Sequence, residues 1–388
     1  MKWPLARLLD VCEIVVGRTP ARANETYWGP GKPWLSIADM NQGRTIWRTK
    51  EQITSQGSRG GRLIEEGTVL LSFKLSIGKV ARAGMPLYTN EAIAALPVKD
   101  KSVIDPSYLA WVLDALELAD NSNRAAMGAT LNKEKLGAIC LPVPPLAVQH
   151  RIVALLDRAH AVLVSSRRVV DLLDELAHAL FEKHFQGESQ SASLEEMGAD
   201  FVSGRNVVAG SDDSAHGVNR VLKVSAISTG RFLAGHSKRM PVEYRPPDDH
   251  RVRRGDILFG RASGSLELLG ATAIVDTDTE DLFLPDKVWR LTVPRNSHVT
   301  PEYLFGVLRS KPARAFVRHN ASGAAGVRNI SKKKMLEYRA PLPALECQFA
   351  YDEEMRYVEN QRARAISAIG VEAALFASLQ ARAFRGEL

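Results

Sequence analysis

Residues 142–157 read PVPPLAVQHRIVALLD, and residues 341–356 read PLPALECQFAYDEEMR. Both stretches begin with prolines and continue as a helix-forming sequence, because proline is tolerated at a helix entry but not in a helix interior. They align at a constant offset of 199 residues (341 − 142), which pairs Pro142, Pro144, Leu146 and Gln149 with Pro341, Pro343, Leu345 and Gln348. A junction that occurs twice predicts an internal duplication.

Further matches follow in the same order along the chain. They pair Gly17-Arg18 with Gly204-Arg205 (offset 187), Gly67–Leu71 with Gly255–Phe259 (188), Tyr108-Leu109 with Tyr303-Leu304 (195), and Gly187-Glu188 with Gly386-Glu387 (199). The offset only grows, as expected if the second copy carries small loop insertions. The chain is therefore predicted to be two copies of a unit of about 190 residues, each a basic block followed by a long helix.

Each block is predicted to consist mainly of short strands joined by turns. GTVLLSF (67–73), GDILFG (255–260) and LFLPDKVWRLTV (282–293) have the apolar and β-branched residues of buried strands. One helix is predicted in each block, at DPSYLAWVLDALEL (105–118) and TPEYLFGVLRS (300–310), since an Asp or Thr precedes a proline at the first helical position. The predicted fold class is α+β, with two similar β-rich blocks joined by two long antiparallel helices.

After each proline stretch the apolar or small positions are spaced three and four residues apart, the heptad pattern of a coiled coil. In the first copy they are Ile152, Leu155, Ala159, Val162, Ser166, Val169, Leu173, Leu176 and Leu180, widened by Leu156, Leu163 and Val170. In the second copy they are Met355, Val358, Ala365, Ile369, Leu375 and Leu379. Each helix is predicted to begin near the glutamine and to span about 34 residues, or roughly 50 Å. Pairing of the two helices is favoured; packing of each helix on its own block is the alternative.

The predicted order of segments is block one at residues 1–145, helix one at 146–188, block two at 189–345 and helix two at 346–388. A chain of 388 residues is long enough for two domains. No window holds the roughly 18 apolar residues of a membrane span, and Asp10 and Glu13 argue against a signal peptide. The three cysteines are far apart, which argues against a zinc site or disulfide framework and favours a reducing, cytoplasmic compartment.

The formal net charge is +7, and its placement favours a polyanionic partner. Residues 1–145 carry 18 Lys and Arg against 14 Asp and Glu, and residues 200–345 carry 23 against 15. A surface with a mild positive bias and no such partner is the alternative interpretation of charge alone. The sequence contains no P-loop, no HExxH, no GxSxG and no Asn/Asp-Pro-Pro-Tyr/Phe motif of an amino-methyltransferase, so it predicts no catalytic residue and no metal ligand.

Arginines and lysines gather in the glycine-rich loops of both blocks, where they are suited to hold phosphate or to bind guanine in a bidentate manner. The candidates in block one, with one amide, are Arg18, Arg22, Asn41, Arg44, Arg59, Arg62, Lys74 and Lys79. Those in block two are Arg205, Arg231, Arg253, Arg254, Arg261, Lys287, Arg318 and Arg328. Arg18 and Arg205 are the strongest pair, since both copies keep Gly-Arg at one register.

The chain resembles the specificity subunit of type I restriction-modification enzymes. The residues that carry the resemblance are GRTPARANETYWGPGKPWLSIADMNQG (17–43), GTVLLSFKLSIGKV (67–80), TLNKEKLGAICLPVPPLAVQHRIVALLD (130–157) and NISKKKMLEYRAPLPALECQ (329–348). The second copy departs from the pattern, with Phe349 and Tyr351 in place of His150 and Ile152.

The resemblance implies a non-catalytic subunit whose two blocks are target-recognition domains. Each would read one half of a bipartite, asymmetric site in double-stranded DNA, and the helices would act as a spacer and dock two modification (methyltransferase) subunits. The residues assigned to docking or spacing are Gln149, Ile152, Leu155, Val162, Leu173, Gln348, Met355, Val358 and Leu375. The chain would hold no cofactor, whereas S-adenosylmethionine would belong to the modification subunits, and ATP and Mg²⁺ to the restriction subunits that translocate DNA. The alternatives are a coiled-coil scaffold that binds only protein and a stand-alone DNA-modifying enzyme.

Overall fold

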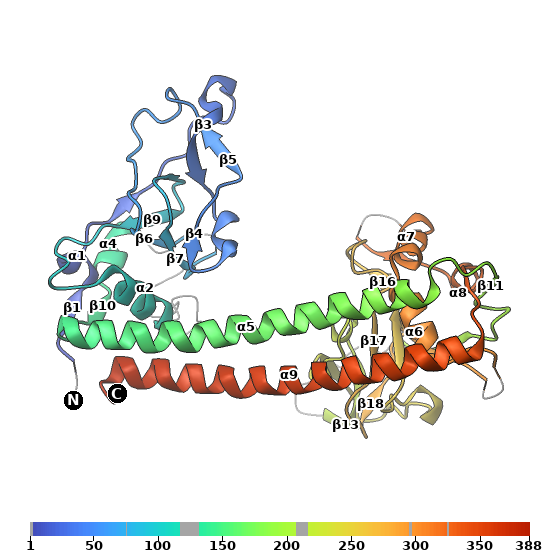
Figure 1. The fold of residues 1–388 in the computed structure, drawn as a ribbon. Helices are drawn as coiled ribbons and strands as arrows, with labels where there is room; N and C mark the ends of the chain where they lie inside the picture. Colours follow the sequence, from blue (N-terminus) through green and yellow to red (C-terminus); the bar gives the residue numbers. More distant parts are fainter. Residues whose placement is uncertain (1–2, 75, 117–131, 207–215, 295–296, 324–325) are drawn as a thin grey trace. The chain divides into compact units, whose positions relative to one another are not determined.

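The computed structural model describes residues 3–74, 76–116, 132–206, 216–294, 297–323 and 326–388. By internal contacts the chain divides into two compact units. Unit 1 comprises Met1–Arg167 and Ser367–Leu388, and unit 2 comprises Arg168–Ile366. Each unit therefore contains one block together with one end of each long helix (Figure 1).

Unit 1 is built on one five-stranded sheet, one three-stranded sheet and one strand pair. The five-stranded sheet has the order β2-β9-β6-β7-β4, the three-stranded sheet β5-β3-β8, and β1 pairs with β10. The strands are β1 (Leu5–Arg7), β2 (Val15–Val16), β3 (Trp28–Leu35), β4 (Thr45–Ile46), β5 (Glu51–Ile53), β6 (Val69–Ser72), β7 (Val80–Ala83), β8 (Tyr88–Thr89), β9 (Ile93–Leu96) and β10 (Cys140–Pro142). The helices of this block are α1 (Leu8–Val11), α2 (Pro106–Ala115) and α4 (Lys133–Gly137).

Unit 2 repeats this plan with a four-stranded sheet, β12-β19-β15-β17, a three-stranded sheet, β14-β13-β18, and the pairs β11-β21 and β16-β20. Its strands are β11 (Ser191–Ser193), β12 (Asp200–Ser203), β13 (His216–Leu222), β14 (Ser237–Pro241), β15 (Ile257–Gly260), β16 (Ala262–Ser263), β17 (Thr272–Ile274), β18 (Leu282–Phe283), β19 (Val288–Thr292), β20 (Arg328–Asn329) and β21 (Arg339–Pro341). Its block helices are α6 (Pro301–Arg309), α7 (Lys311–His319) and α8 (Lys332–Leu336).

Strand register confirms the predicted duplication residue by residue. In unit 1, Leu70 pairs with Ala95 and Trp34 with Glu51. In unit 2, Leu258 pairs with Arg290 and Val221 with Lys238, which are the same positions at offsets of 188, 195 and 187. The two blocks are therefore two copies of one topology, and the fold is α+β as predicted.

The predicted block helices form, and their first turns are capped as expected. Asp105 caps α2 by accepting from the amides of Ser107 and Tyr108, and Thr300 caps α6 by accepting from Tyr303. Residues 117–118 of the first predicted helix lie outside the described residues. The predicted strand residues at 282–293 form two short strands, β18 and β19, which residues 284–287 separate.

The two long helices are α5 (Leu146–Phe185) and α9 (Leu345–Arg385). Each begins at the leucine after the prolines, three residues before the glutamine, which agrees with the predicted start. Each contains 40 or 41 residues, so the predicted length of about 34 residues was wrong. Both helices stop as predicted, shortly before a glycine with positive φ, Gly187 at +92° and Gly386 at +80°. Within the described chain no helix is long and apolar enough to cross a membrane.

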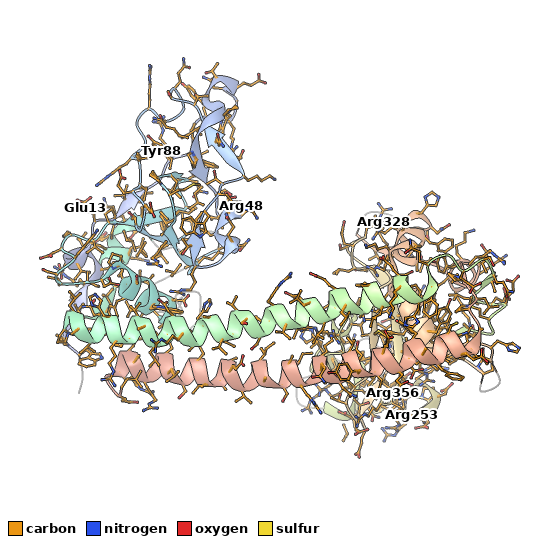
Figure 2. The ribbon with its side chains drawn as sticks, in the orientation of Figure 1. Glu13, Arg48, Tyr88, Arg253, Arg328 and Arg356 are labelled. Atoms are coloured by element: carbon orange, nitrogen blue, oxygen red, sulfur yellow. The ribbon has the colours of Figure 1, made fainter. Side chains whose placement is uncertain are left out.

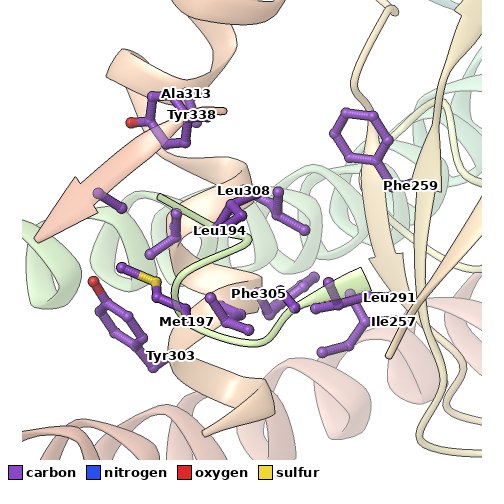
Figure 3. Close-up of a cluster of buried hydrophobic side chains, with 14 of the residues drawn as sticks. Leu194, Met197, Ile257, Phe259, Leu291, Tyr303, Phe305, Leu308, Ala313 and Tyr338 are labelled. Carbon is purple, nitrogen blue, oxygen red and sulfur yellow. The ribbon is translucent and has the colours of Figure 1, made fainter. Parts of the chain in front are cut away.

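In each unit the long helices pack both on the block and on each other, so the two predicted alternatives hold together. In unit 1, Ile152 and Leu156 of α5 and Ala383 of α9 belong to the same buried cluster as α2. In unit 2, Ala177 of α5 and Met355 of α9 join the buried cluster shown in Figure 3, which centres on Tyr303, Leu308 and the strands β15 and β19. The hydrophobic core of each block therefore continues onto the helix pair.

Candidate nucleic-acid interface

The repeated Gly-Arg pair is explained first by its glycine. A Cβ on Gly17 would lie 2.2 Å from the carbonyl oxygens of Thr89 and Asn90, and a Cβ on Gly204 would lie 1.8 Å from that of Leu284. Real Cβ atoms do not approach backbone so closely, so both copies need glycine where the chain passes this strand. The glycine is therefore repeated because the backbone packs closely at this position. The arginine that follows it lies on the surface.

Three of the predicted DNA-binding arginines in block one lie close together on one part of the surface. Arg18 is exposed and donates through Nη1 to the carbonyl of Arg59 at 2.9 Å. Arg62, also exposed, forms an ion pair with Glu13 at 2.7 Å. Exposed ion pairs of this kind contribute little to stability and can open for a phosphate.

Arg22 occupies an aromatic corner of the same block. Its guanidinium lies 3.8 Å from the ring centroid of Trp28 and binds both carboxylate oxygens of Glu51, at 2.5 and 3.0 Å. The bond to Glu51 raises the pKa of Arg22 and lowers that of the carboxylate. Lys74 is exposed beside Phe73, with its Nζ 5.4 Å from the ring centroid.

Arg44 has a structural role that the sequence did not indicate. Its guanidinium lies 3.3 Å from the Trp111 ring centroid and bonds Asp114 of α2 at 3.1 Å. Burial lowers its pKa, although Asp114 opposes the shift. Arg44 therefore ties the loop to the α2 helix and offers little free surface to DNA.

Asn41 and Lys79 meet beside Arg44. The Lys79 Nζ donates to Asn41 Oδ1 at 2.6 Å, and both residues border a cavity of about 330 Å³ that also touches Trp111, His160 and Phe376. The structure thus brings three of the eight predicted residues of block one to a single recess.

In block two, most of the predicted arginines are bound to acidic or backbone groups. Arg231 pairs with Asp174 of α5 at 3.6 Å, Arg253 with Asp248 at 2.8 Å, and Arg254 with Asp278 at 3.5 Å. Arg261 donates to the carbonyl of Asp286 at 2.8 Å and Arg328 to that of Gly323 at 3.4 Å. Arg205, Lys287 and Arg318 are exposed.

The predicted residues do not form one patch in either block. Figure 2 places Glu13, the partner of Arg62, and Arg48, which borders one recess together with the predicted Asn41, on different sides of unit 1. It places Arg253 and Arg328 on different sides of unit 2. A duplex contacts one side of a small domain, so only a subset of each set can touch DNA at once.

Gln149 and Gln348, assigned to docking or helix entry, are fully buried and bonded inside the chain. Gln149 Oε1 accepts from the amide of Asp105 at 2.9 Å, and its Nε2 donates to the carbonyls of Val103 and Pro144, both at 2.8 Å. Gln348 repeats this with the amide of Thr300 at 2.8 Å and the carbonyls of His298 and Pro343 at 2.9 Å.

Each glutamine therefore joins three chain segments: the proline entry, the start of the long helix and the capping residue of α2 or α6. A tyrosine completes each junction, since Tyr108 donates to the Pro142 carbonyl and Tyr303 to that of Pro341. Helix entry, rather than partner docking, is the role that these contacts give to Gln149 and Gln348.

The remaining predicted docking or spacer residues divide by exposure. Ile152, Met355 and Val358 are buried, and Leu155 and Leu173 are half-buried. Val162 and Leu375 are 50% and 57% exposed, so their assignment to a buried seam was wrong. The buried stripe of α5 runs one residue later, through Leu156, Leu163, Val170 and Ala177.

Sequence reasoning missed an ionic network in unit 2 and an exposed cluster in unit 1. Asp174 pairs with Arg362 at 2.8 Å and with Arg309 at 3.9 Å, and Glu359 pairs with both arginines. The exposed cluster contains Trp47 and Arg48, and the alternation of Arg, Trp and Lys in residues 44–50 was the signal that could have revealed it. Across the described residues, no group of three or more His, Cys, Asp or Glu side chains is placed to hold a metal ion.

Comparison with known proteins finds similarity to one group of proteins. Residues 1–165 match the family model described as the type I restriction modification DNA specificity domain. The MjaIX specificity subunit of Methanocaldococcus jannaschii is 26% identical over 190 residues, which are 47% of this chain and 44% of that protein. The EcoKI specificity subunit of Escherichia coli K12 is 23% identical over 345 residues, covering 81% of this chain and 72% of the other.

Solved structures share the fold over the full chain. The S subunit of the M. genitalium type I restriction-modification system aligns with a TM-score of 0.56 at 13% identity, covering 99% of this chain and 96% of that one. A chain from a study of complex assembly and conformational transition of the type I R-M system aligns with a TM-score of 0.53 at 16% identity, covering 100% and 98%. The predicted resemblance to type I restriction enzyme specificity subunits is confirmed by the family model over residues 1–165 and by these relatives.

Proposed function

We propose that the chain is the DNA sequence-specificity subunit of a type I restriction-modification complex and has no catalytic activity of its own. Residues 1–145 and 189–345 act as target-recognition domains, each reading one half of a bipartite, asymmetric site in duplex DNA. Residues 146–188 and 346–388 act as the spacer and dock the modification subunits. S-adenosylmethionine belongs to those subunits, and ATP and Mg²⁺ to the restriction subunits. The complex works on DNA in the cytoplasm.

The observation that carries this proposal is the duplicated junction. Both copies keep the glutamine, the tyrosine and the capped block helix in the same hydrogen-bonded arrangement, while their surface loops differ. A protein that reads two different half-sites needs one scaffold twice and two different surfaces. The net positive charge of both blocks supports a polyanionic partner.

The exposed apolar residues of the long helices support a docking role. In unit 1, Val162 and Val164 of α5 and Val371 and Leu375 of α9 are 49–69% exposed. Val162 and Leu375 lie at one level of the helix pair, because Ser166 bonds Glu372 and His160 contacts Phe376 on either side of them. In unit 2, Tyr357 is 67% exposed. Apolar residues that a helix leaves uncovered are suited to contact a protein partner.

The experiment exchanges block two and reads the methylated sequence. Residues 200–345 are replaced by the corresponding block of another family member, and the variant is expressed with its modification and restriction subunits. Methylome sequencing is expected to show a change in one half of the site and no change in the other. A methylated site that stays the same, or that changes in both halves, would refute the assignment of one half-site to each block.

The two alternatives are separated with purified protein. A stand-alone modifying enzyme would transfer methyl groups from S-adenosylmethionine to an unmethylated duplex that carries the recognition site, without any other subunit. No methyl transfer by the purified chain alone is expected. A scaffold that binds only protein would show DNA binding that is absent or insensitive to salt. A DNA-reading subunit should lose affinity steeply as salt rises, because phosphate contacts release counterions.

A further inference from the structure

Residues 38–50 of unit 1 form a surface loop with an unusual set of outward side chains. The loop contains the short helix η2 (Asp39–Gln42), the turn at Gly43 and strand β4, and it ends at β5. Its outer side borders a polar recess of about 380 Å³, lined by Asn41, Gln42, Arg48 and Lys50 among others. None of Gln42, Trp47, Arg48 and Lys50 was among the candidates that the sequence suggested.

The loop is clamped from the inside. The Asp39 side chain is buried and accepts from the amides of Ser36 at 2.9 Å and Lys50 at 3.0 Å. Gln42 Nε2 donates to the carbonyls of Asp39 at 2.9 Å and Arg48 at 2.8 Å. These bonds join both ends of the loop, so its outer residues are held in place before any partner arrives. Preorganisation of this kind lowers the entropy lost on binding.

The outward side chains are those that contact bases and phosphates. Trp47 is 66% exposed, and its ring packs over Gly84, where a Cβ would lie 2.7 Å from the ring. Arg48 and Lys50 are exposed and form no ion pair with any described residue. Lys79 donates a hydrogen bond to Asn41 Oδ1, so the two amide hydrogens of Asn41 remain as donors. Figure 2 shows Arg48 on the surface of this unit. An arginine and an amide read base edges, and a lysine holds phosphate.

The second copy keeps the strand register, the turn glycine and the following arginine of this loop, whereas Ala226 and Thr229 stand in place of Asp39 and Gln42 and the outer residues also differ. Trp34 pairs with Glu51 in unit 1, and Val221 pairs with Lys238 in unit 2, so the two loops align at an offset of 187. Gly43 and Gly230 both have positive φ, at +115° and +75°, and each is followed by an arginine that pairs with an aspartate. At the outer positions Asn41, Trp47, Arg48 and Lys50 are replaced by Ser228, Ala234, Gly235 and Ser237.

The turn, the arginine and the strand register do not dictate which residues stand at the outer positions. Two copies that contact different base sequences need different outer residues, because side chains on a fixed scaffold determine which base edges are bound. The outer residues of the loop therefore differ between the copies, as expected of surfaces that contact different base sequences.

We propose that Asn41, Trp47, Arg48 and Lys50 form the DNA-contacting surface of unit 1, in which Asn41 and Arg48 read base edges. This inference rests on the proposed function and deepens it. Arg48 determines specificity through a base edge, Lys50 and Lys79 hold the DNA backbone, and Trp47 contacts the duplex through its exposed ring. Gln42 is a positioning residue that holds the Arg48 carbonyl and does not itself touch DNA.

The test uses the full chain in complex with its modification subunits. Methylome sequencing of the wild-type system gives the site, and fluorescence anisotropy measures binding to a labelled duplex that carries it. Competitor duplexes then change one base pair at a time in each half. Arg48→Ala is expected to weaken binding to the cognate duplex by roughly 10- to 100-fold and to abolish discrimination at base pairs of one half only. Lys50→Ala is expected to weaken all duplexes alike and to reduce the salt slope by about 1.

Lys101→Ala is the matched control, because Lys101 is an exposed cation of unit 1 that has no ion-pair partner among the described residues and lies outside the loop. The complex that carries Lys101→Ala is expected to have the affinity and base preferences of the wild-type complex. Gln42→Ala is expected to lose discrimination at the same base pairs as Arg48→Ala, and the double variant to lose no more than either, since the two act as one unit.

The outcomes distinguish this inference from the proposed function. If Arg48→Ala keeps the wild-type base preferences in both halves, the reading surface lies elsewhere and the inference is wrong, although the proposed function stands. If the wild-type complex shows no preference for its own methylated sequence, the proposed function itself fails. Loss of discrimination in both halves at once would also overturn the inference, because it would indicate a general effect on the complex.

Discussion

Replacing Gln149 or Gln348 with leucine tests the duplicated junction that the sequence predicts. Leucine retains much of the glutamine volume, so little of the effect should come from a cavity. What it removes is three hydrogen bonds in each unit. In unit 1 the substitution strands the Asp105 amide and the carbonyls of Val103 and Pro144 in a buried site.

The size of the effect follows from those three groups. A buried backbone group without a partner costs about 1–3 kcal/mol, and carbonyls, which have a second lone pair, fall at the low end. The sum is about 3 kcal/mol for opening the junction, which corresponds to a change of about 100-fold in the local opening equilibrium. The Asp105 amide lies at the cap of α2, so the loss is expected to concentrate in α2 and in the first turns of α5.

Amide hydrogen exchange followed by mass spectrometry measures this locally. Gln149→Leu should speed exchange in peptides from α2 and leave those from α6 unchanged, and Gln348→Leu should do the reverse, so each variant is the control for the other. Gln361→Leu, a half-buried glutamine of α9, controls for the substitution itself. Unchanged exchange in both block helices, or equal acceleration of both by either variant, would refute the role assigned to the glutamines.

Two further predictions concern the long helices. Deleting seven residues from each of α5 and α9 should keep their heptad faces in register and shorten the gap between the two methylated half-sites; a gap of unchanged length in methylome sequencing would contradict the spacer proposal. Burial raises the pKa of Asp352 from 3.8 to about 6, and the hydroxyl of Thr300 only partly offsets this shift. The folded chain therefore binds this proton more readily than the unfolded chain, and the carboxylate lowers stability progressively as pH rises from about 4 to about 6. Asp352→Asn should raise the free energy of unfolding at pH 7, by at most about 3 kcal/mol, and have little effect at pH 4; an equal gain at both values in urea unfolding would show that the carboxylate charge is not the cause.

The parts of the fold that the sequence predicts correctly are those that depend on local patterns. Prolines followed by a leucine and a glutamine mark the start of α5 and α9, Asp105 and Thr300 before proline mark the block helices, and Gly187 and Gly386 mark the helix ends. Each of these signals acts within about one helical turn, so no distant partner is needed to interpret it.

The incorrect predictions concern residues whose role depends on contacts with distant parts of the chain. Heptad spacing allows two registers when both Leu155 and Leu156 are apolar, and only packing on α2 selects Leu156 for the core. In the sequence Arg44 does not differ from other basic loop residues. Its structural role comes from contacts with Asp114 and Trp111 of α2, which lie about 70 residues away in the chain. The same holds for Arg231, whose partner Asp174 lies on the preceding long helix. Which arginines are free to bind DNA is decided by contacts that the linear sequence does not display.

The two junctions keep the same hydrogen bonds but differ in the sizes of the side chains beside them. Trp111 of α2 corresponds to Gly306 of α6 at an offset of 195, and Ile152 of α5 corresponds to Tyr351 of α9 at an offset of 199. A Cβ on Gly306 would already lie 2.5 Å from the Tyr351 hydroxyl, so the glycine is what makes room for the tyrosine. The duplication therefore preserved the hydrogen bonds that build each junction, while the side-chain sizes around those bonds diverged.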